Sequence, residues 1–319
     1  MPNAVPPPPA SPSAELVYLN GQFVPRSQAC ISVDDAGFQH AVGLFETMAA
    51  SHGQIFRLAQ HLARLATSAR QLGLVPELHP QPLAQAVQET LARNQLSEAR
   101  IRLTLTAGPV SLLRPSPQAG AGHAQGENPG SGPTLLIVAT PPTQYDPVYF
   151  ERGITVLIAP PGANPFDQLA GHKTLAYWGR LRALRQAAAA GAGEVIWLNV
   201  TNHLASGAIS NLFLVKGGKL LTPIARGEET SGALAAPVLP GVTRAAVLEI
   251  AQARSIPVER RMLTVTDLLD ADEVFLTNSS WHLLPVTQVE KKPIATGQPG
   301  PLTHDLRTAL LALIDQETA

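Results

Sequence analysis

The sequence predicts two domains of mixed structure, a small α+β domain followed by a larger domain of α/β or α+β type. The chain of 319 residues is long enough for two cores, and 45% apolar with 15% charged residues can fill them. Strand-like and helix-like segments occur on both sides of a division near residues 142–152. We therefore expect a small domain at residues 15–141, a linker at 142–152 and a large domain at 153–319.

The small domain is predicted to combine hairpins with two helices. An Asn20-Gly21 turn joins two short apolar segments, as in a hairpin, and His52-Gly53 indicates a second one. Apolar residues at helical spacing predict the helices. The expected elements are strands at 17–19, 22–24, 45–50 and 54–58, helices at 58–73 and 82–94, and strands at 100–106 and 134–140.

The large domain is expected to open with a strand at 153–159 and to end with a helix at 302–314. Between them, a helical pattern runs from 173 to a stop at Gly191. A strand at 206–215 turns at Gly217-Gly218 into a second strand at 220–223, and a helix follows at 245–254. Outside these elements, residues 1–14 form a Pro-rich tail expected to be disordered, and the Gly-, Pro- and Ala-rich residues 115–133 a mobile loop.

Composition argues against several classes of partner. A net charge of −1 gives no reason to expect nucleic acid or an anionic membrane. The apolar runs are shorter than the ~20 residues that cross a bilayer. Cys30 is the single cysteine, which excludes an intrachain disulfide and fits a reducing compartment, so we expect a cytoplasmic protein. No metal site is expected.

Lys173 is the most informative residue. It is one of five lysines, and the other four lie at Gly- or Pro-rich turns where an ammonium is solvated. Lys173 instead lies within the apolar segment from Gly171 to Trp178. Burial there lowers the pKa of the amine and makes it nucleophilic, which suits Schiff-base chemistry. The alternative is a lysine whose stem packs while its head reaches water.

Further motifs occur in a fixed order around this lysine. They are Asp35-Ala-Gly-Phe-Gln-His-Ala-Val-Gly-Leu-Phe-Glu46-Thr47, His61-Leu-Ala-Arg64-Leu, Ser206-Gly-Ala-Ile-Ser-Asn211-Leu-Phe, Leu239-Pro-Gly-Val-Thr-Arg244, Phe275-Leu-Thr-Asn278-Ser279 and Pro285-Val286. Together with Lys173 they resemble the class IV aminotransferase family over about residues 16–315. The resemblance implies a two-domain fold of type IV, similar to D-amino acid aminotransferase, and pyridoxal 5'-phosphate (PLP) bound to Lys173.

The resemblance also implies a site for the phosphate of PLP. Amides at a helix N-terminus and a forked arginine suit a phosphate dianion. Val242 and Thr243 begin the helix that follows Gly241, and the family pattern adds Arg64, Asn278 and Ser279. The alternative roles are a solvated helix face for Arg64 and a helix cap for Ser279.

Ser206 is the clearest departure from the family pattern. Most members have a glutamate there, five residues before Asn211, which keeps the pyridine nitrogen of PLP protonated. A serine can hydrogen-bond that nitrogen but supplies no negative charge. The ring should then accept electrons less well, which penalises a transaminase more than a lyase. The alternatives are a shifted register, with His203 or a distant carboxylate facing the nitrogen, or loss of activity.

Asn278-Ser279 followed by Pro285-Val286, and the segment His172-Lys173-Thr174-Leu175, are most similar to 4-amino-4-deoxychorismate lyases. The usual Arg-Gly before the substrate loop is Ala107-Gly108 here, so Arg102 or Arg114 would have to bind a carboxylate. The remaining candidates for contact with substrate are His40, Thr47 and Tyr177.

Three functions follow from the resemblance. The first is an aminodeoxychorismate lyase, the second an amino acid transaminase of the branched-chain or D-amino acid type, and the third a weakly active PLP-binding protein. The partner expected in each case is a small primary amine. The family also implies a homodimer whose active sites are shared.

Overall fold

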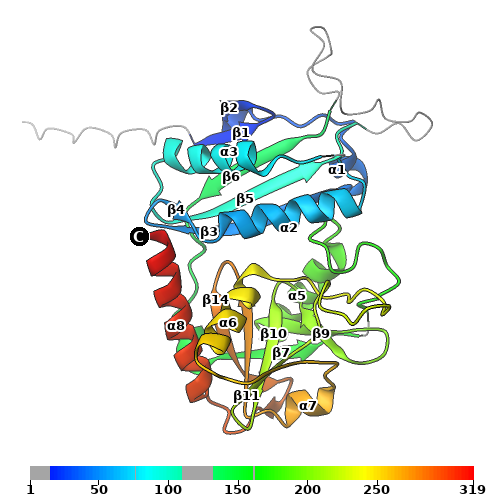
Figure 1. The fold of residues 1–319 in the computed structure, drawn as a ribbon, viewed down its shortest axis with the longest axis vertical. Coiled ribbons are helices and arrows are strands. Elements are labelled where there is room, and N and C mark those ends of the chain that lie inside the picture. Colours follow the sequence, from blue (N-terminus) through cyan, green and yellow to red (C-terminus); the bar gives the residue numbers. More distant parts are fainter. Residues whose placement is uncertain (1–14, 76, 110–131, 161) are drawn as a thin grey trace, which may run out of the picture.

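The computed structural model describes residues 15–75, 77–109, 132–160 and 162–319. The expected tail at 1–14, Arg114 and nearly all of the expected loop at 115–133 lie outside these residues. The described part forms two sheets, one above the other in Figure 1, on either side of residues 142–152. The two-domain α+β fold that the sequence predicts is confirmed.

The small domain has a six-stranded sheet in the order β2-β1-β6-β5-β3-β4. Its elements are β1 (Leu16–Leu19), β2 (Gln22–Pro25), a 3-10 turn (Arg26–Gln28), α1 (Ala36–His40), β3 (Gly43–Ser51), β4 (Gln54–Ile55), α2 (Leu58–Gln71), α3 (Pro80–Arg93), β5 (Ala99–Thr106) and β6 (Leu135–Thr140). Both predicted hairpins are confirmed, although β4 contains only two residues.

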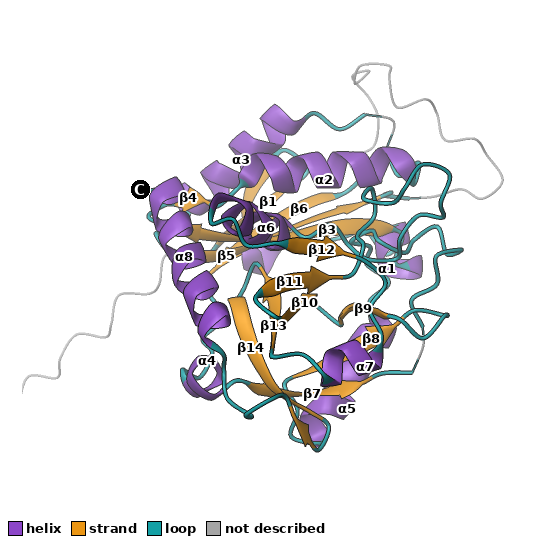
Figure 2. Ribbon diagram, turned by 60° about the horizontal axis from the view of Figure 1, so that its bottom comes forward, coloured by secondary structure: helices purple, strands orange, loops and turns teal. Residues whose placement is uncertain are grey.

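Helices α2 and α3 cover one face of this sheet (Figure 2). Alternate residues of β5 are buried, including Ile101 and Leu103, and they pack with Leu62 and Leu65 of α2. The residues between them, Arg100 and Arg102, therefore point to the other face, which is turned towards the large domain. The amphipathic pattern of the strand thus places two arginines between the domains.

The large domain has a nine-stranded sheet in the order β12-β11-β10-β13-β14-β7-β8-β9, with β15 beside β14. The helices are α4 (Val148–Arg152), α5 (Trp178–Ala189), α6 (Val242–Ala253), α7 (Val265–Leu269) and α8 (Pro301–Thr318). The strands are β7 (Ile154–Ile158), β8 (Glu194–Leu198), β9 (Leu204–Gly207), β10 (Asn211–Lys216), β11 (Lys219–Thr222), β12 (Val258–Arg260), β13 (Glu273–Asn278), β14 (His282–Val289) and β15 (Lys292–Pro293).

Two sequence predictions for this domain need correction. The expected strand at 206–215 is two strands, β9 and β10, separated by a turn at Ala208, Ile209 and Ser210. The helix expected from Lys173 begins only at Trp178. Residues 173–175 are extended because they pair with β3 of the small domain: Phe45 N donates to Lys173 O and Leu175 N to Gly43 O, both at 2.9 Å.

A second connection between the domains is ionic. Arg57, at the start of α2, donates to Glu249 of α6 at 2.8 and 2.6 Å and to Glu317 of α8 at 3.3 and 3.0 Å. The Arg57 side chain is only 5% exposed, whereas those of Glu249 and Glu317 are 58% and 33% exposed, so the pairs lie at the edge of the contact between the domains. Together with the 173–175 segment, this contact holds the small domain against α6 and α8.

In the described part of the chain, no helix is long and apolar enough to span a membrane. No cluster of metal-ligating side chains occurs among the same residues.

Candidate active site

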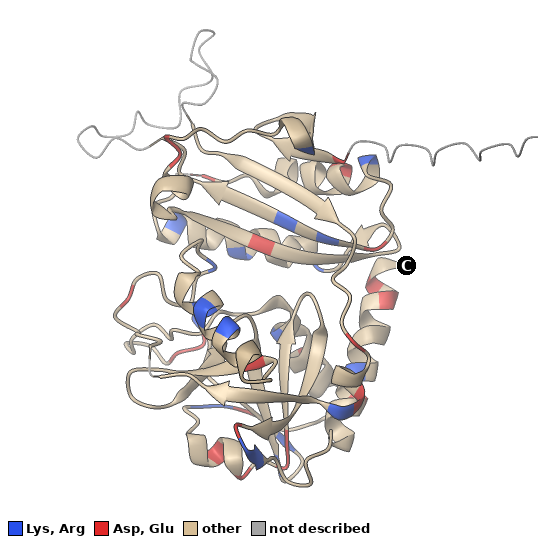
Figure 3. Cartoon of the chain, turned by 180° about the vertical axis from the view of Figure 1, so that it is seen from behind, with Lys and Arg blue, Asp and Glu red and all other residues tan. Residues whose placement is uncertain are grey.

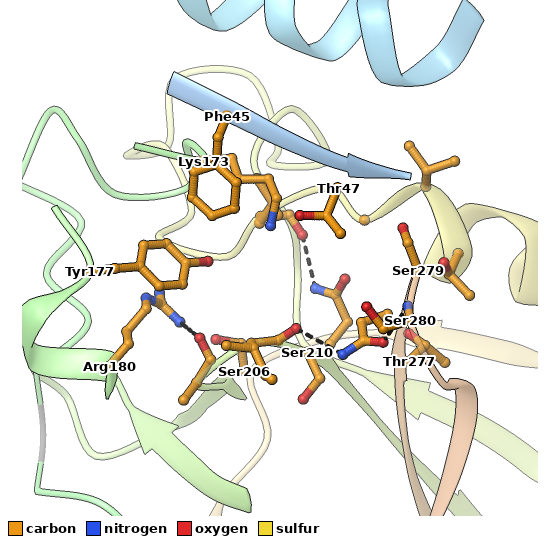
Figure 4. Close-up of a pocket in the computed structure, with 18 of the residues that line it drawn as sticks. Phe45, Thr47, Lys173, Tyr177, Arg180, Ser206, Ser210, Thr277, Ser279 and Ser280 are labelled. Carbon is orange, nitrogen blue, oxygen red and sulfur yellow. Dashed lines mark hydrogen bonds between the residues drawn. The ribbon is translucent and has the colours of Figure 1, made fainter. Parts of the chain in front are cut away.

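A cavity of about 370 Å³ lies between the two domains. This volume is within the range typical of small-molecule sites. Both domains contribute to the wall (Figure 4). The polar and aromatic lining residues include Phe45, Thr47, Arg64, Arg100 and Arg102 of the small domain, and Lys173, Tyr177, Arg180, Ser206, Asn211, Thr243, Thr277, Asn278, Ser279 and Ser280 of the large one.

Lys173 projects into this cavity from the extended segment beside β3. That segment fits because β4 pairs only with Ala50 and Ser51, which leaves the start of β3 free. Gly43 permits the approach, since a Cβ there would lie 2.6 Å from Leu175 Cδ1. The backbone hydrogen bonds at 173–175 therefore fix the lysine more firmly than a loop would.

The Lys173 amine lies close to two aromatic rings and near the positive charges of two arginines. Its Nζ is 4.4 Å from the ring centroid of Phe45 and 5.9 Å from that of Tyr177. Burial lowers the pKa of Lys173, and the nearby charges of Arg64 and Arg102 lower it further. A lower pKa increases the fraction of neutral amine, which is the nucleophilic and basic form.

Arg64 is held in the cavity wall by a buried carboxylate. Its Nε donates to Glu46 Oε1 at 2.8 Å, and its Nη1 donates to Pro240 O at 3.0 Å. His61 Nδ1 lies 2.8 Å from Glu46 Oε2 and donates to it, because an ionised carboxylate only accepts. Although burial opposes ionisation of Glu46, Arg64 and His61 lower its pKa to about 2. Glu46 is thus a permanent anion that orients Arg64.

Next to Arg64 is the N-terminus of α6. The helix begins after Gly241 without a side-chain cap, so its first N–H groups have no helical partner. Asn211 Nδ2 donates to Leu239 O at 2.9 Å and holds the preceding turn. Arg64, the buried Thr243 and the helix terminus together form a site suited to a phosphate.

Asn278, which the sequence predicts as a phosphate ligand, makes hydrogen bonds within its own turn. Its Oδ1 accepts from Ser280 N at 2.8 Å and Trp281 N at 3.0 Å, and its Nδ2 donates to Ile209 O at 3.3 Å. The side chain shapes the turn after β13, and Asn278 also lines the cavity. Ser279 lines the cavity beside it.

Thr277 was missed by the sequence reasoning. Its Oγ1 is buried, lines the cavity and has no hydrogen-bond partner among the described residues. Buried hydroxyls are normally satisfied, so this one fits a bound polar group. A signal was available, because Thr277 directly precedes the Asn278-Ser279 motif.

Ser206 lies across the cavity from Lys173 (Figure 4). It pairs with Trp197 in β8, and its Oγ donates to Gly207 O at 2.9 Å. His203 does not line the cavity, and its backbone N–H donates to Asn199 Oδ1 at 2.9 Å. Of these two residues, Ser206 is therefore the one that lines the cavity opposite Lys173.

Glu194 of β8, the strand that pairs with β9, is a buried carboxylate. It accepts hydrogen bonds from Ala208 N at 3.1 Å, Ile209 N at 3.2 Å and Ser210 Oγ at 3.0 Å. Burial raises the pKa of Glu194. This carboxylate supports the turn between β9 and β10 and is absent from the described lining of the cavity.

The candidate substrate residues divide into two groups. Thr47 and Tyr177 line the cavity, and Arg102 does so with its guanidinium 3.9 Å from the Phe45 ring centroid. Burial lowers the pKa of Arg102, and Arg100 lowers it further. His40, the last residue of α1, is exposed and does not belong to the described lining, while Arg114 lies outside the described residues.

Comparison with known proteins adds to this geometry. The family model "Amino-transferase class IV" matches residues 43–289. A Methanocaldococcus jannaschii protein named "Putative branched-chain-amino-acid aminotransferase" is 32% identical over 91% of this chain and 93% of its own length.

Comparison with solved structures gives similar results. The Escherichia coli branched-chain amino acid aminotransferase has a TM-score of 0.82 at 26% identity, over 96% of this chain and 97% of that one. A Legionella pneumophila protein named "Putative 4-amino-4-deoxychorismate lyase" has a TM-score of 0.74 at 26% identity, over 90% and 96% of the chains. A further branched-chain aminotransferase structure, solved with pyridoxamine 5'-phosphate, has a TM-score of 0.80.

Proposed function

The chain belongs to the class IV aminotransferases, a family of PLP enzymes, and on this premise we propose that it is a 4-amino-4-deoxychorismate lyase. Its reaction would convert the substrate into 4-aminobenzoate and pyruvate. The single observation that carries the proposal is the position of Ser206 across the cavity from Lys173.

The cavity fits PLP. Lys173 would bind its aldehyde carbon, and Arg64, Val242, Thr243 and Ser279 would hold its phosphate. The unpartnered Thr277 hydroxyl also suits a polar group there. When bound, PLP supplies a carbonyl that condenses with the substrate amine and a ring that withdraws electrons from the adjacent carbon.

The electrostatics of the lining favour an anionic ligand. Arg64, Arg100, Arg102, Lys173 and Arg180 line the cavity, whereas no Asp or Glu does so in the described part of the chain. Figure 3 shows basic residues, and one acidic residue, on the strands of the small-domain sheet, and further basic residues on α5. Beyond the phosphate, this charge suits a substrate with carboxylates, and Arg100 and Arg102 are placed to bind one.

The lyase reaction suits a site without a carboxylate opposite Lys173. The neutral Lys173 amine would take the proton from the carbon that bears the substrate nitrogen. The bond from the neighbouring ring carbon to the enolpyruvyl oxygen then breaks, and the released enol becomes pyruvate after it gains a proton. Because loss of this group makes the ring aromatic, the reaction needs less electron withdrawal than transamination does.

A transaminase is the second candidate. The names of the Methanocaldococcus jannaschii relative and the Escherichia coli structure favour it. Arg100 and Arg102 would suit the second carboxylate of a dicarboxylic amino acid or oxo acid equally well. A weakly active PLP-binding protein is disfavoured, since Lys173 is present and its pKa is lowered.

Two assays of the purified protein separate these functions. With aminodeoxychorismate, a lyase produces 4-aminobenzoate and pyruvate in equal amounts. With branched-chain or D-amino acids and 2-oxoglutarate, a transaminase produces glutamate. Turnover of the amino acids at a much higher kcat/KM than aminodeoxychorismate would overturn the lyase proposal.

We also propose that the protein forms a homodimer in the cytoplasm. Phe38 of α1 and Trp178 of α5 are each 74% exposed, and Phe166 is 72% exposed. The dimer that the family resemblance implies would cover some of these exposed aromatic side chains, and two-fold pairing is the commonest form of homo-oligomer. Light scattering should give the mass of a dimer, and a fully active monomer would contradict this proposal.

A further inference from the structure

Arg180, which sequence reasoning did not single out, lies beside Ser206 on the wall that faces Lys173. Its Nη1 donates to Gly207 O at 3.1 Å and to Ala208 O at 2.8 Å. Ser206 Oγ donates to the same Gly207 oxygen at 2.9 Å. The hydroxyl and the guanidinium are therefore neighbours, as Figure 4 shows.

No carboxylate balances the charge of Arg180 in the described part of the chain. Its other close neighbours are the rings of Tyr177 and Trp197, whose centroids lie 5.7 and 5.8 Å from its Cζ. Glu194 is directed at the N–H groups of Ala208 and Ile209 instead. The positive charge of Arg180 thus acts on whatever occupies the cavity next to Ser206.

The chemistry of PLP indicates which of its atoms lies next to Ser206 and Arg180. The ring nitrogen is para to the carbon that carries the aldehyde, so when the aldehyde is bound to Lys173 the nitrogen points to the opposite wall. This step rests on the proposed use of Lys173 as the PLP lysine. Opposite Lys173 are the Ser206 hydroxyl and the Arg180 guanidinium.

We propose that Arg180 and Ser206 together keep the ring nitrogen of PLP unprotonated. A fixed cation disfavours a second positive charge beside it, and Arg180 keeps N–H groups that can donate to a neutral nitrogen, because only its Nη1 is bonded to Gly207 and Ala208. Ser206, whose one O–H donates to Gly207 O, supplies no negative charge that would favour a protonated ring. Arg180 is then a residue that determines reaction specificity. An unprotonated ring withdraws electrons weakly, so it favours substrates whose elimination is driven by another change, such as aromatisation of the substrate ring.

The test is the ¹⁵N NMR spectrum of the holoenzyme reconstituted with PLP labelled at the ring nitrogen. The wild type should show the chemical shift of an unprotonated pyridine at pH 7. Ser206→Glu should change it only in part, because the new carboxylate pairs with Arg180. The double variant Ser206→Glu/Arg180→Gln should show the shift of a protonated pyridine.

Three results would overturn the proposal: a protonated nitrogen in the wild type, full protonation in Ser206→Glu alone, or an unprotonated nitrogen in the double variant. If a Ser206 variant does not fold, Arg180→Gln alone should still increase the protonated fraction relative to wild type, and an unchanged spectrum would count against Arg180. Arg182→Gln, an exposed position on the same helix, is the matched control and should leave the spectrum unchanged.

Borohydride trapping on each variant separates this proposal from the proposed function. If PLP is attached to Lys173 but the wild-type nitrogen is protonated, only the role of Arg180 fails. If PLP is not attached to Lys173, the proposed function fails first.

Discussion

Ser206 and Arg180 donate hydrogen bonds to one carbonyl oxygen, that of Gly207, at 2.9 and 3.1 Å. A hydroxyl and a cation thus occupy the wall where most of the resembled family has a carboxylate. Ser206 belongs to β9 and Arg180 to α5, so this part of the wall depends on both elements.

The first prediction concerns this pair. Ser206→Glu should raise the rate of the half-reaction with an amino acid donor, and adding Arg180→Gln should raise it further, by about tenfold for each unit of increase in the pKa of the ring nitrogen. Elimination from aminodeoxychorismate should be unchanged or slower. Single-turnover absorbance measurements would follow the conversion of PLP to its amine form. Complete and rapid conversion by the wild type would contradict the assumed weakness of the ring.

The second prediction is that PLP binds covalently to Lys173. The purified protein should be yellow, and borohydride reduction followed by peptide mass mapping should place the label on Lys173. Lys173→Ala should lose both the label and at least about 10³-fold in kcat, since the nucleophile and the base are removed together. Lys216→Ala changes an exposed lysine paired with Asp272 and serves as control. A label on any other lysine would refute the assignment.

Glu46 provides a test of stability. Glu46→Gln should destabilise the fold by about 3–5 kcal/mol, because it leaves the Arg64 guanidinium, whose side chain is only 11% exposed, without its anion. PLP affinity should fall as well, since Arg64 loses its orientation. Chemical denaturation and fluorescence titration with PLP would measure the two effects. Glu89→Gln removes an exposed partner of Arg93 and should change stability by less than about 1 kcal/mol.

The same carboxylate predicts a pH dependence. The pKa of Glu46 is lowered to about 2 from its usual 4.5. A lowered carboxyl pKa contributes stability above the unfolded value, and this contribution disappears as the pH falls from 4.5 through 2. The free energy of unfolding of Glu46→Gln should therefore decrease less steeply than that of the wild type as the pH falls from 4.5 to about 2. Parallel curves for the two proteins would mean that Glu46 is not the group responsible.

The sequence was sufficient to predict those features of the fold that depend on local chemistry. The Asn20-Gly21 and Gly217-Gly218 turns depend on neighbouring residues only, and these two predictions agree with the structure. The predicted start of α5 was wrong, because residues 173–175 pair with β3, which is more than a hundred residues away in the sequence. Arg180 was missed for a similar reason, since its role appears only when α5 is placed beside the turn after β9.

Gly241 offers a test of the phosphate site. A Cβ at this position would lie 2.0 Å from Asn211 Oδ1. Gly241→Ala should therefore displace the N-terminus of α6, and we expect PLP affinity to fall by about tenfold or more, equivalent to at least 1.4 kcal/mol. Gly179→Ala is the control, because its Cβ would meet Trp197 only at 3.9 Å. Equal PLP affinities for the two variants would argue against a role of this helix terminus.

Arg102 should contribute to binding of substrate more than of cofactor. It lies on β5 with its guanidinium over Phe45, and both residues line the cavity. Arg102→Gln removes a charged donor to a carboxylate, which typically costs about 1.5–3 kcal/mol, so KM should rise by about 10- to 150-fold. PLP affinity should change much less, because Arg64 and α6 form the phosphate site. Steady-state kinetics and PLP titration distinguish the two, with the exposed Arg93→Gln as control. If KM is unchanged while PLP affinity falls, Arg102 acts on the cofactor and not on the substrate carboxylate.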